Sequence, residues 1–167
     1  MRDILSISRD TVYGKEHHFD DILKATNAED LFRLYREYVP VNNSFESLRP
    51  YVERHKHGEE NVLFPGKPDM YATTSGTTAE PKWVPMTHKY IKDVYGKMTH
   101  VWIWNFITHR SRIFGGHIFQ TVGKECEGYA PDGTLFGSVS GVLVRDVPAI
   151  IKKHYTQPPS VVSIADY

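Results

Sequence analysis

The chain has 167 residues, of which 40% are hydrophobic and 13% aromatic, so it contains enough apolar material for the core of a globular domain. Twenty Lys and Arg balance twenty Asp and Glu, which argues against nucleic acid or an anionic membrane as a partner, because both usually bind proteins with excess positive charge. The single cysteine, the lack of a signal-peptide core at the start and the lack of any stretch near the roughly 20 apolar residues of a membrane span together predict a soluble, cytoplasmic protein.

A first helix is predicted over residues 26–38. Thr26-x-x-Glu29 resembles a capping box at its start. Apolar residues then recur at helical spacing until Pro40 stops the run, namely Leu31, Leu34, Tyr35 and Tyr38.

A second, weaker helix is predicted over residues 47–57. Pro50 would be tolerated in its first turn, and Gly58 suits the position after its end. Because its faces are mostly charged, this helix is predicted to lie on the surface.

A loop rich in threonine is predicted between two short strands. Residues 69–73 form an extended-looking run before the loop, and residues 83–86 can form only a short strand or edge segment after it, since Pro85 cannot donate to a ladder.

The longest helix is predicted to start at Thr87 as its N-cap and to end before Gly115-Gly116. One broad face is apolar, so we expect the helix to pack against a substantial apolar surface. The face consists of Tyr90, Ile91, Val94, Tyr95, Met98, Val101, Trp102 and Phe106.

The remaining third of the chain predicts shorter elements. Residues 117–122 are expected to form a strand, residues 131–133 a turn, and Asp146-Val147-Pro148 the start of a helix with proline in its first position. Residues 159–167 look unfinished, which suggests a fragment. The alternation of helices and short strands predicts an α/β fold with mixed α+β layers.

The loop at residues 73–82 has the composition of a phosphate-binding loop. A triphosphate needs a close backbone, hydroxyl donors and a cation. The loop supplies hydroxyls from Thr74, Ser75, Thr77 and Thr78, backbone freedom from Gly76, and positive charge from Lys82. The P-loop pattern G-x-x-x-x-G-K-[ST] does not fit, because Pro81 and Trp83 flank the lysine. The alternative is an ordinary Ser/Thr-rich turn between strands.

The full motif resembles the ATP-phosphate loop of the adenylate-forming superfamily, which includes acyl-CoA synthetases, luciferases and peptide-synthetase adenylation domains. It reads Thr74-Ser75-Gly76-Thr77-Thr78-Ala79-Glu80-Pro81-Lys82. One departure is visible, since Ala79 stands where that superfamily usually has a second glycine.

The flanks of the loop narrow the resemblance to the auxin-responsive acyl-acid-amido synthetase family, and to its bacterial-type members. The flanking segments are residues 58–65, Gly-Glu-Glu-Asn-Val-Leu-Phe-Pro, and residues 82–87, Lys-Trp-Val-Pro-Met-Thr. Further matching pieces follow in order and cover most of the chain, at residues 11–15, 39–40, 131–134, 137–141 and 159–162.

This resemblance implies an enzyme that uses ATP and Mg²⁺ to convert a small carboxylic acid to an acyl-adenylate, and then passes the acyl group to an amino acid. It implies Lys82 as the catalytic residue. Together with Thr74, Ser75, Gly76, Thr77 and Thr78, Lys82 is also implied to bind ATP. An acyl-CoA ligase, or a non-catalytic nucleotide-binding remnant, are the alternatives.

By the same resemblance, residues 1–167 form part of the large N-terminal domain of an adenylate-forming enzyme. The residues for adenine and ribose and the mobile C-terminal domain would lie beyond Tyr167. The chain on its own is therefore expected to be inactive.

Other candidate sites have simpler explanations. His17-His18 and His55-x-His57 lack a second ligand pair at convincing spacing, so they are expected on the surface and no metal site is predicted from them. Acidic neighbours disfavour a thiolate at Cys126. The aromatic cluster at residues 101–106 could line an acyl pocket, although core packing is the simpler account.

Overall fold

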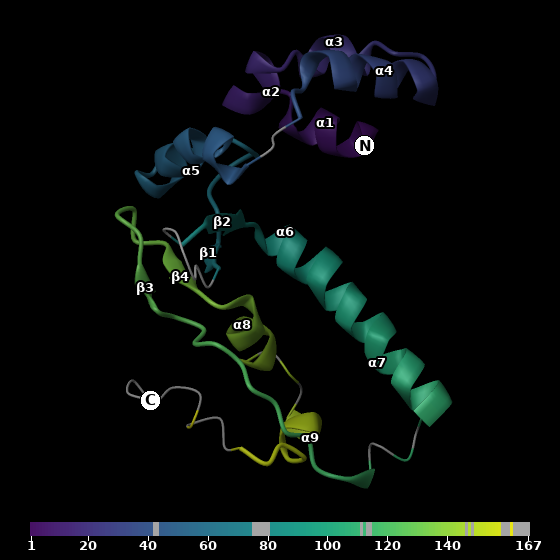
Figure 1. Cartoon of the computed structure of the whole chain (residues 1–167), viewed down its shortest axis with the longest axis vertical. Coiled ribbons are helices and arrows are strands. Elements are labelled where there is room, and N and C mark those ends of the chain that lie inside the picture. The colour runs from purple at the N-terminus through teal and green to yellow at the C-terminus, as the bar shows by residue number, and fades with distance from the viewer. Residues whose placement is uncertain are drawn as a thin grey trace. The chain divides into compact units, whose positions relative to one another are not determined.

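The computed structural model describes residues 1–41, 44–74, 81–110, 112, 115–145, 147, 149–157 and 161 (Figure 1). The chain divides into two compact units. One is Met1–Pro68 with Ala130–Asp132, and the other is Asp69–Tyr129 with Gly133–Tyr167. The described part of the first unit is helical and the second carries a four-stranded sheet, so the mixed α/β class expected from the sequence is confirmed.

Four helices open the first unit: α1 (Arg2–Ser8), α2 (Val12–Glu16), α3 (Phe19–Leu23) and α4 (Ala28–Tyr38). Their shared core consists of Leu5, Phe19, Ile22, Leu31 and Val39. Thr11 caps α2, because its hydroxyl oxygen accepts a hydrogen bond from the Gly14 N–H at 3.0 Å.

Helix α4 confirms the predicted first helix, but its cap is one residue later than expected. The Asn27 side chain accepts a hydrogen bond from the Asp30 N–H at 2.9 Å. Asn27 therefore fills the role expected of Thr26, and asparagine is at least as good an N-cap as threonine.

The predicted second helix consists of a 3₁₀ turn, η1 (Phe45–Ser47), followed by α5 (Arg49–Lys56). Pro50 lies in the first turn of α5, and Gly58 adopts a positive φ of 89° after its end, as expected. Most residues of this helix are at least partly exposed, as expected, but Val52 and His55 are buried. The buried face could not be predicted from the sequence, because most residues around it are charged.

The sheet of the second unit has the order β2-β1-β4-β3. Its strands are β1 (Met70–Thr73), β2 (Trp83–Met86), β3 (Gly128–Tyr129) and β4 (Leu135–Gly137). Strand β1 pairs antiparallel with β2 and parallel with β4, and β3 pairs antiparallel with β4. Both strands predicted around the threonine-rich loop are confirmed.

Pro85 fits β2 because of the register of the β1–β2 pair. Thr74 N–H donates to the Lys82 carbonyl, which makes Thr74 and Lys82 a hydrogen-bonded pair. Bonded and non-bonded pairs alternate along an antiparallel ladder, so Pro85, opposite Tyr71, occupies a non-bonded position with its nitrogen directed away from β1. The proline therefore costs this ladder no hydrogen bond.

The long helix after β2 begins as predicted, with the Thr87 hydroxyl accepting from the Tyr90 N–H at 3.2 Å. It continues as α6 (His88–Tyr90), the π-helix η2 (Ile91–Gly96) and α7 (Lys97–Arg110). The π-helical turn was not anticipated from the sequence.

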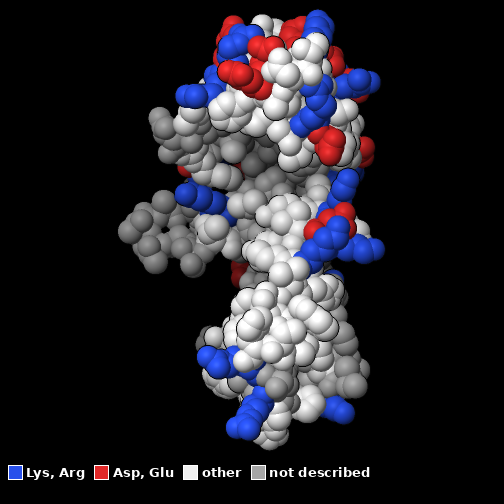
Figure 2. Space-filling model, turned by 90° about the vertical axis from the view of Figure 1, so that its right-hand side faces the viewer, with Lys and Arg blue, Asp and Glu red and all other residues white. Residues whose placement is uncertain are grey.

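The predicted packing of this helix is only partly right. Ile91 and Tyr95 pack against a core cluster formed by Met70, Met86 and Val142. Farther along, α7 buries no side chain in the described part of the chain. Met98, Val101 and Trp102 are exposed by 57%, 62% and 61%. Figure 2 faces the side on which α7 lies in Figure 1, and its lower part is mostly uncharged surface.

The last third of the chain departs most from expectation. Residues 117–122 form no strand, and their one pairing is an isolated bridge between Ile118 and Tyr155. The predicted turn at 131–133 is confirmed, with Gly133 at a φ of 83°. Helix α8 (Val139–Arg145) was not predicted, and α9 (Ala149–Lys152) starts one residue after Pro148.

Some predictions fall outside the described residues, including the helix start at Asp146 and Pro148 and most of the terminal segment 159–167. Within the described residues, no helix is both long enough and apolar enough to cross a bilayer.

Candidate functional site

The threonine-rich loop leaves the sheet between β1 and β2, and its two ends are fastened to each other. Thr73 and Trp83 are the last strand pair. Beyond them, Thr74 N–H donates to the Lys82 carbonyl at 3.2 Å, and Lys82 N–H donates to the Thr74 hydroxyl at 3.3 Å. These two hydrogen bonds, called the loop clasp below, hold the first and last predicted ATP-binding residues together.

The other predicted site residues, Ser75, Gly76, Thr77 and Thr78, lie outside the described residues. Lys82 and Thr74 are exposed. Among the described residues, the Lys82 ammonium makes no ion pair within 4 Å, so its charge is available to a ligand.

A hollow of about 480 Å³ opens beside the loop clasp. Its lining combines hydroxyl groups, a carboxylate and aromatic rings from the ends of β1 and β2 and from residues 123–138. The lining residues are Thr73, Thr74, Pro81, Trp83, Gly123, Glu127, Phe136 and Ser138. The hollow has the size of a small-molecule site.

Aromatic contacts form the wall of this hollow. The rings of Trp83 and Phe136 lie with centroids 4.3 Å apart, and Tyr71 lies 5.7 Å from Trp83. Such pairs stabilise a wall by burying large apolar areas in a defined geometry. They couple β2 to β4 across β1, and so fix the position from which the loop departs.

Glu127 brings a carboxylate to Thr73, the residue before the loop clasp. The Thr73 hydroxyl donates to its Oε2 at 3.2 Å. The Glu127 N–H donates to the Phe136 carbonyl at 2.8 Å, which extends the β3–β4 pairing by one residue and fixes the backbone of Glu127. No sequence pattern pointed to this residue, because 54 positions separate it from Thr73.

Glycines allow the segment before β3 to approach β4 and α8 closely. A Cβ on Gly137 would lie 2.2 Å from the Glu125 carbonyl oxygen, and a Cβ on Gly141 2.5 Å from the Glu125 nitrogen. Both distances are far inside van der Waals contact, so only glycine fits. The close approach lets Ser138 N–H donate to the Lys124 carbonyl at 2.7 Å. The glycines of residues 137–141, which the sequence left open between ligand loops and tight packing, thus serve close packing.

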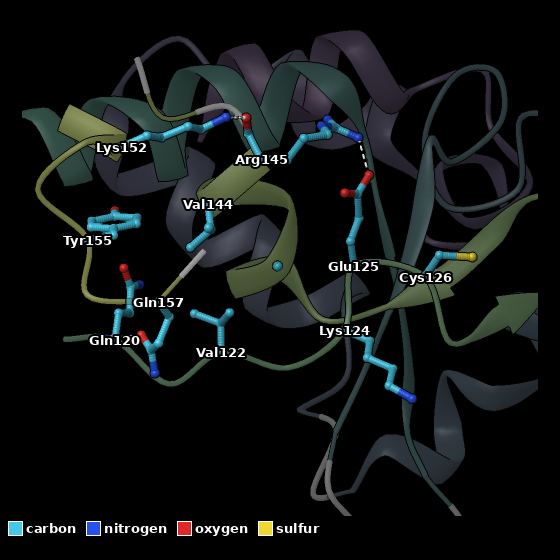
Figure 3. Close-up of a pocket in the computed structure, with 11 residues that line it drawn as sticks. Gln120, Val122, Lys124, Glu125, Cys126, Val144, Arg145, Lys152, Tyr155 and Gln157 are labelled. Carbon is cyan, nitrogen blue, oxygen red and sulfur yellow. Dashed lines mark hydrogen bonds and ion pairs between the residues drawn. The ribbon is translucent and has the colours of Figure 1, made fainter. Parts of the chain in front are cut away.

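A second hollow, of about 520 Å³, is lined by residues from 120–126, from α8 and from residues 152–157 (Figure 3). Arg145 forms an ion pair with Glu125, and the Lys152 ammonium donates to the backbone carbonyl of Arg145 at 2.6 Å. In Figure 3 the sulfur of Cys126 points away from the other lining side chains. None of the described residues that line this hollow is a predicted site residue.

The histidines considered as metal ligands have other roles. His17 stacks on Tyr13 with ring centroids 3.9 Å apart, and His18 lies 3.4 Å from the Asp21 carboxylate. His57 is exposed, whereas His55 is buried, contrary to the surface position expected for both. Over the described ranges, no three or more His, Cys, Asp or Glu side chains gather as a metal cage.

Residues 1–167 match the family described as the GH3 family N-terminal domain. Over 92 residues the chain is 32% identical to a protein of Oryza sativa subsp. japonica described as a probable indole-3-acetic acid-amido synthetase, GH3.13. That match covers 53% of this chain and 19% of the rice protein.

Solved structures of GH3.15 share the fold. The GH3.15 acyl acid amido synthetase gives a TM-score of 0.72 at 16% identity, covering 99% of this chain and 28% of that one. The AtGH3.15 synthetase in complex with 2,4-DB gives 0.70 at 17% identity, covering 86% of this chain and 24% of that one. The chain thus spans less than a third of the length of these relatives.

Proposed function

The chain belongs to the GH3 family, and on that premise we propose that it carries the ATP-phosphate-binding part of an acyl acid amido synthetase. The observation that supports this most is the loop clasp, which holds Thr74 and Lys82 together at the mouth of a hollow lined by hydroxyl groups. The residues flanking the loop favour a bacterial-type member. Residues 1–167 would form part of the large acid-activating domain of the whole protein.

The proposed reaction has two steps. In the first, a carboxylate oxygen of the acid attacks the α-phosphorus of ATP, the bond to the bridging oxygen breaks, and pyrophosphate leaves. In the second, the amine nitrogen of an amino acid attacks the carbonyl carbon of the acyl-adenylate. AMP leaves with the electrons of the carbon–oxygen bond, the nitrogen loses a proton, and an amide remains.

In the first step this chain would bind and orient the phosphates. The Lys82 ammonium would offset the charge that develops as pyrophosphate departs, and the hydroxyls of Thr74, Ser75, Thr77 and Thr78 would donate hydrogen bonds to phosphate oxygens. The loop clasp would hold both ends of the loop before ATP arrives, which lowers the entropy lost on binding.

The donor set beside the loop also fits Mg²⁺. This cation prefers hard oxygen ligands and is usually held by one or two carboxylates together with substrate phosphates, rather than by an all-protein cage. The hollow offers the hydroxyls of Thr73, Thr74 and Ser138 and one carboxylate. When bound, Mg²⁺ would supply positive charge to the phosphates.

The acid substrate is proposed to have an apolar body. The relatives are named for acids of this kind, indole-3-acetic acid in one case and bound 2,4-DB in another. In this chain the exposed apolar surface of α7, with Val101 and Trp102, would suit one wall of such a site. Basic residues and no acidic ones occur along α7, which also favours a carboxylate ligand.

Titration of ATP into the 167-residue chain tests the proposal. We expect ATP with Mg²⁺ to bind, and Lys82→Ala to weaken binding about tenfold or more, because a charge-assisted contact to phosphate is lost. Ser75→Ala should weaken it to a smaller extent. Lys97→Ala is the matched control, since this exposed lysine on α7 forms an ion pair with Asp93 at 3.5 Å. Equal affinities for wild type and Lys82→Ala would refute the assignment of Lys82.

Activity assays separate the alternatives. In the whole enzyme, acid-dependent exchange between ATP and pyrophosphate followed by amide formation identifies an amido synthetase. Transfer of the acyl group to the thiol of coenzyme A identifies an acyl-CoA ligase instead. Nucleotide binding without any exchange by the whole enzyme would indicate a non-catalytic protein. The 167-residue chain alone is expected to bind nucleotide without turnover.

A further inference from the structure

Glu127 stands out because it places a negative charge beside a loop built for anions. It lines the same hollow as Thr74, one of the two residues of the loop clasp, and as Pro81 and Trp83, which flank the other. Two like charges at close range repel, even near a protein surface where solvent screens them. A carboxylate at this position would therefore weaken ATP binding unless a cation lay between it and the phosphates.

No protein side chain supplies that cation within the described residues. The nearby Glu125 is paired with Arg145, whereas Glu127 has no Lys, Arg or His within ion-pair distance in the part of the chain that the structure describes. Its Oε2 accepts from the Thr73 hydroxyl, and its Oε1 makes no hydrogen bond there. One oxygen is thus oriented by a neighbour, and the other is left for a ligand.

The local geometry holds this carboxylate in place. The Glu127 backbone is fixed by its hydrogen bond to Phe136, and the side chain by the hydroxyl at the end of β1. A hydrogen bond of this kind is the usual means by which proteins orient a metal-ligating carboxylate. Hydroxyls of Thr73, Thr74 and Ser138 surround the same space with further oxygen atoms.

We propose that Glu127 is a ligand for the Mg²⁺ that accompanies ATP, binding the cation through Oε1, and that Thr73 is the residue that positions it. This inference rests on the proposed function, because it requires ATP at the neighbouring loop. A single protein carboxylate is enough for such a site, since the phosphates and water complete the coordination of Mg²⁺.

The test compares ATP binding with and without the metal. For each form of the 167-residue chain, the Kd of ATP is measured by calorimetry in excess Mg²⁺ and again in excess EDTA. Wild type should bind Mg²⁺-ATP at least tenfold more tightly than metal-free ATP. In Glu127→Gln the carboxylate is gone, so Mg²⁺-ATP should bind at least tenfold more weakly than in wild type, while metal-free ATP binds as well or better. Thr73→Val should show a smaller change in the same direction.

Glu125→Gln is the matched control. It removes the same charge two residues away, from a side chain that is engaged by Arg145, so its preference for Mg²⁺ should equal that of wild type. Circular dichroism of each variant checks that the fold is retained.

Two results would overturn the inference in distinguishable ways. If wild type prefers Mg²⁺-ATP and folded Glu127→Gln keeps that preference, Glu127 is not a metal ligand, although the proposed function stands. If wild type binds ATP in neither condition, the proposed function fails and this inference fails with it.

Discussion

His55 illustrates how a single side chain can be set by contacts that its sequence neighbours do not reveal. It is fully buried, stacks on Phe64 with ring centroids 4.7 Å apart, and accepts a hydrogen bond from the Leu63 N–H at its Nε2. Because Nε2 is an acceptor, the neutral ring carries its proton on Nδ1. Nδ1 has no hydrogen-bond partner among the described residues. Protonation would place a second proton on Nε2 and break the bond to Leu63.

We predict that His55 makes the fold sensitive to acid. Burial lowers the pKa of His55 below its ordinary value of 6.5, although Glu59 and Asp132 act in the opposite direction. The unfolded chain therefore takes up the proton more readily than the folded chain, so the stabilisation is complete above pH 6.5 and is lost as pH falls through the lowered pKa. This residue can contribute at most about 1.4 kcal/mol per pH unit.

Urea unfolding at pH 7.5 and pH 5.0 measures the effect. The loss of unfolding free energy between the two values should be smaller in His55→Gln than in wild type. His57→Gln, which changes the exposed histidine two positions away, should keep the loss seen in wild type. An identical loss in all three proteins would contradict the prediction.

At the scale of whole elements, α4 shows how its cap sets a boundary. The helix begins at Ala28 because the side chain of Asn27 satisfies the Asp30 N–H, one of the donors that a helix start leaves without an intrahelical partner. The amide nitrogen of Asn27 also donates to the Asp30 carboxylate at 2.9 Å. Thr26, which the sequence pattern favoured, makes neither contact.

We predict that Asn27→Ala lowers the free energy of unfolding by about 1 kcal/mol, because it removes the N-cap of a helix that packs on the core of the first unit. Thr26→Ala should change stability by less than about 0.5 kcal/mol, as is usual for a surface substitution. Chemical unfolding followed by circular dichroism measures both. If Thr26→Ala lowered the free energy of unfolding more than Asn27→Ala did, Thr26 would be the N-cap instead.

The elements that could be predicted from the sequence are those whose signals are local. N-cap residues, prolines and glycines predicted the following elements: α4, α5, the strands around the threonine-rich loop and the start of the long helix. Strands β3 and β4 are only two and three residues long, and their pairing depends on distant residues. Helix α8 was missed because Gly141 within it weakens a helical pattern.

The same distinction applies to the candidate site. Thr74 and Lys82 lie within one motif, and the β1–β2 hairpin brings them together as that motif suggested. Glu127, Phe136 and Ser138 reach the site through the parallel pairing of β1 with β4. Such a crossover connects segments more than fifty positions apart, and no spacing rule in the sequence encodes it.

For the molecule as a whole, the exposed surface of α7 is the main departure from an ordinary globular surface. Isolated apolar side chains on a surface are common, but contiguous ones mark places where something binds. On α7 the exposed large side chains include Met98, Val101, Trp102, Trp104 and Ile107. The rice and GH3.15 proteins are much longer than the region they share with this chain.

We predict that Trp102→Gln lowers the fluorescence of the apolar dye ANS bound to the chain, with a change in unfolding free energy of less than about 0.5 kcal/mol, because the side chain is 61% exposed. The control is Phe32→Gln on α4, where Arg36 lies over the ring at 5.8 Å. This control should leave ANS fluorescence nearly unchanged. A loss of about 3 kcal/mol or more for Trp102→Gln would show instead that Trp102 is packed in a core.

The orientation of Pro85 also affects how the outer edge of β2 can pair with another chain. Strand β2 lies at one end of the sheet order, and the nitrogen of Pro85 faces outward with no hydrogen to donate. An unprotected outer strand offers a row of amides on which another chain can add a strand, and this is a common route to aggregation. Pro85 interrupts that row in the middle of a four-residue strand. The same residue that the β1–β2 ladder tolerates without cost therefore disfavours intermolecular strand pairing at the outer edge of this hairpin.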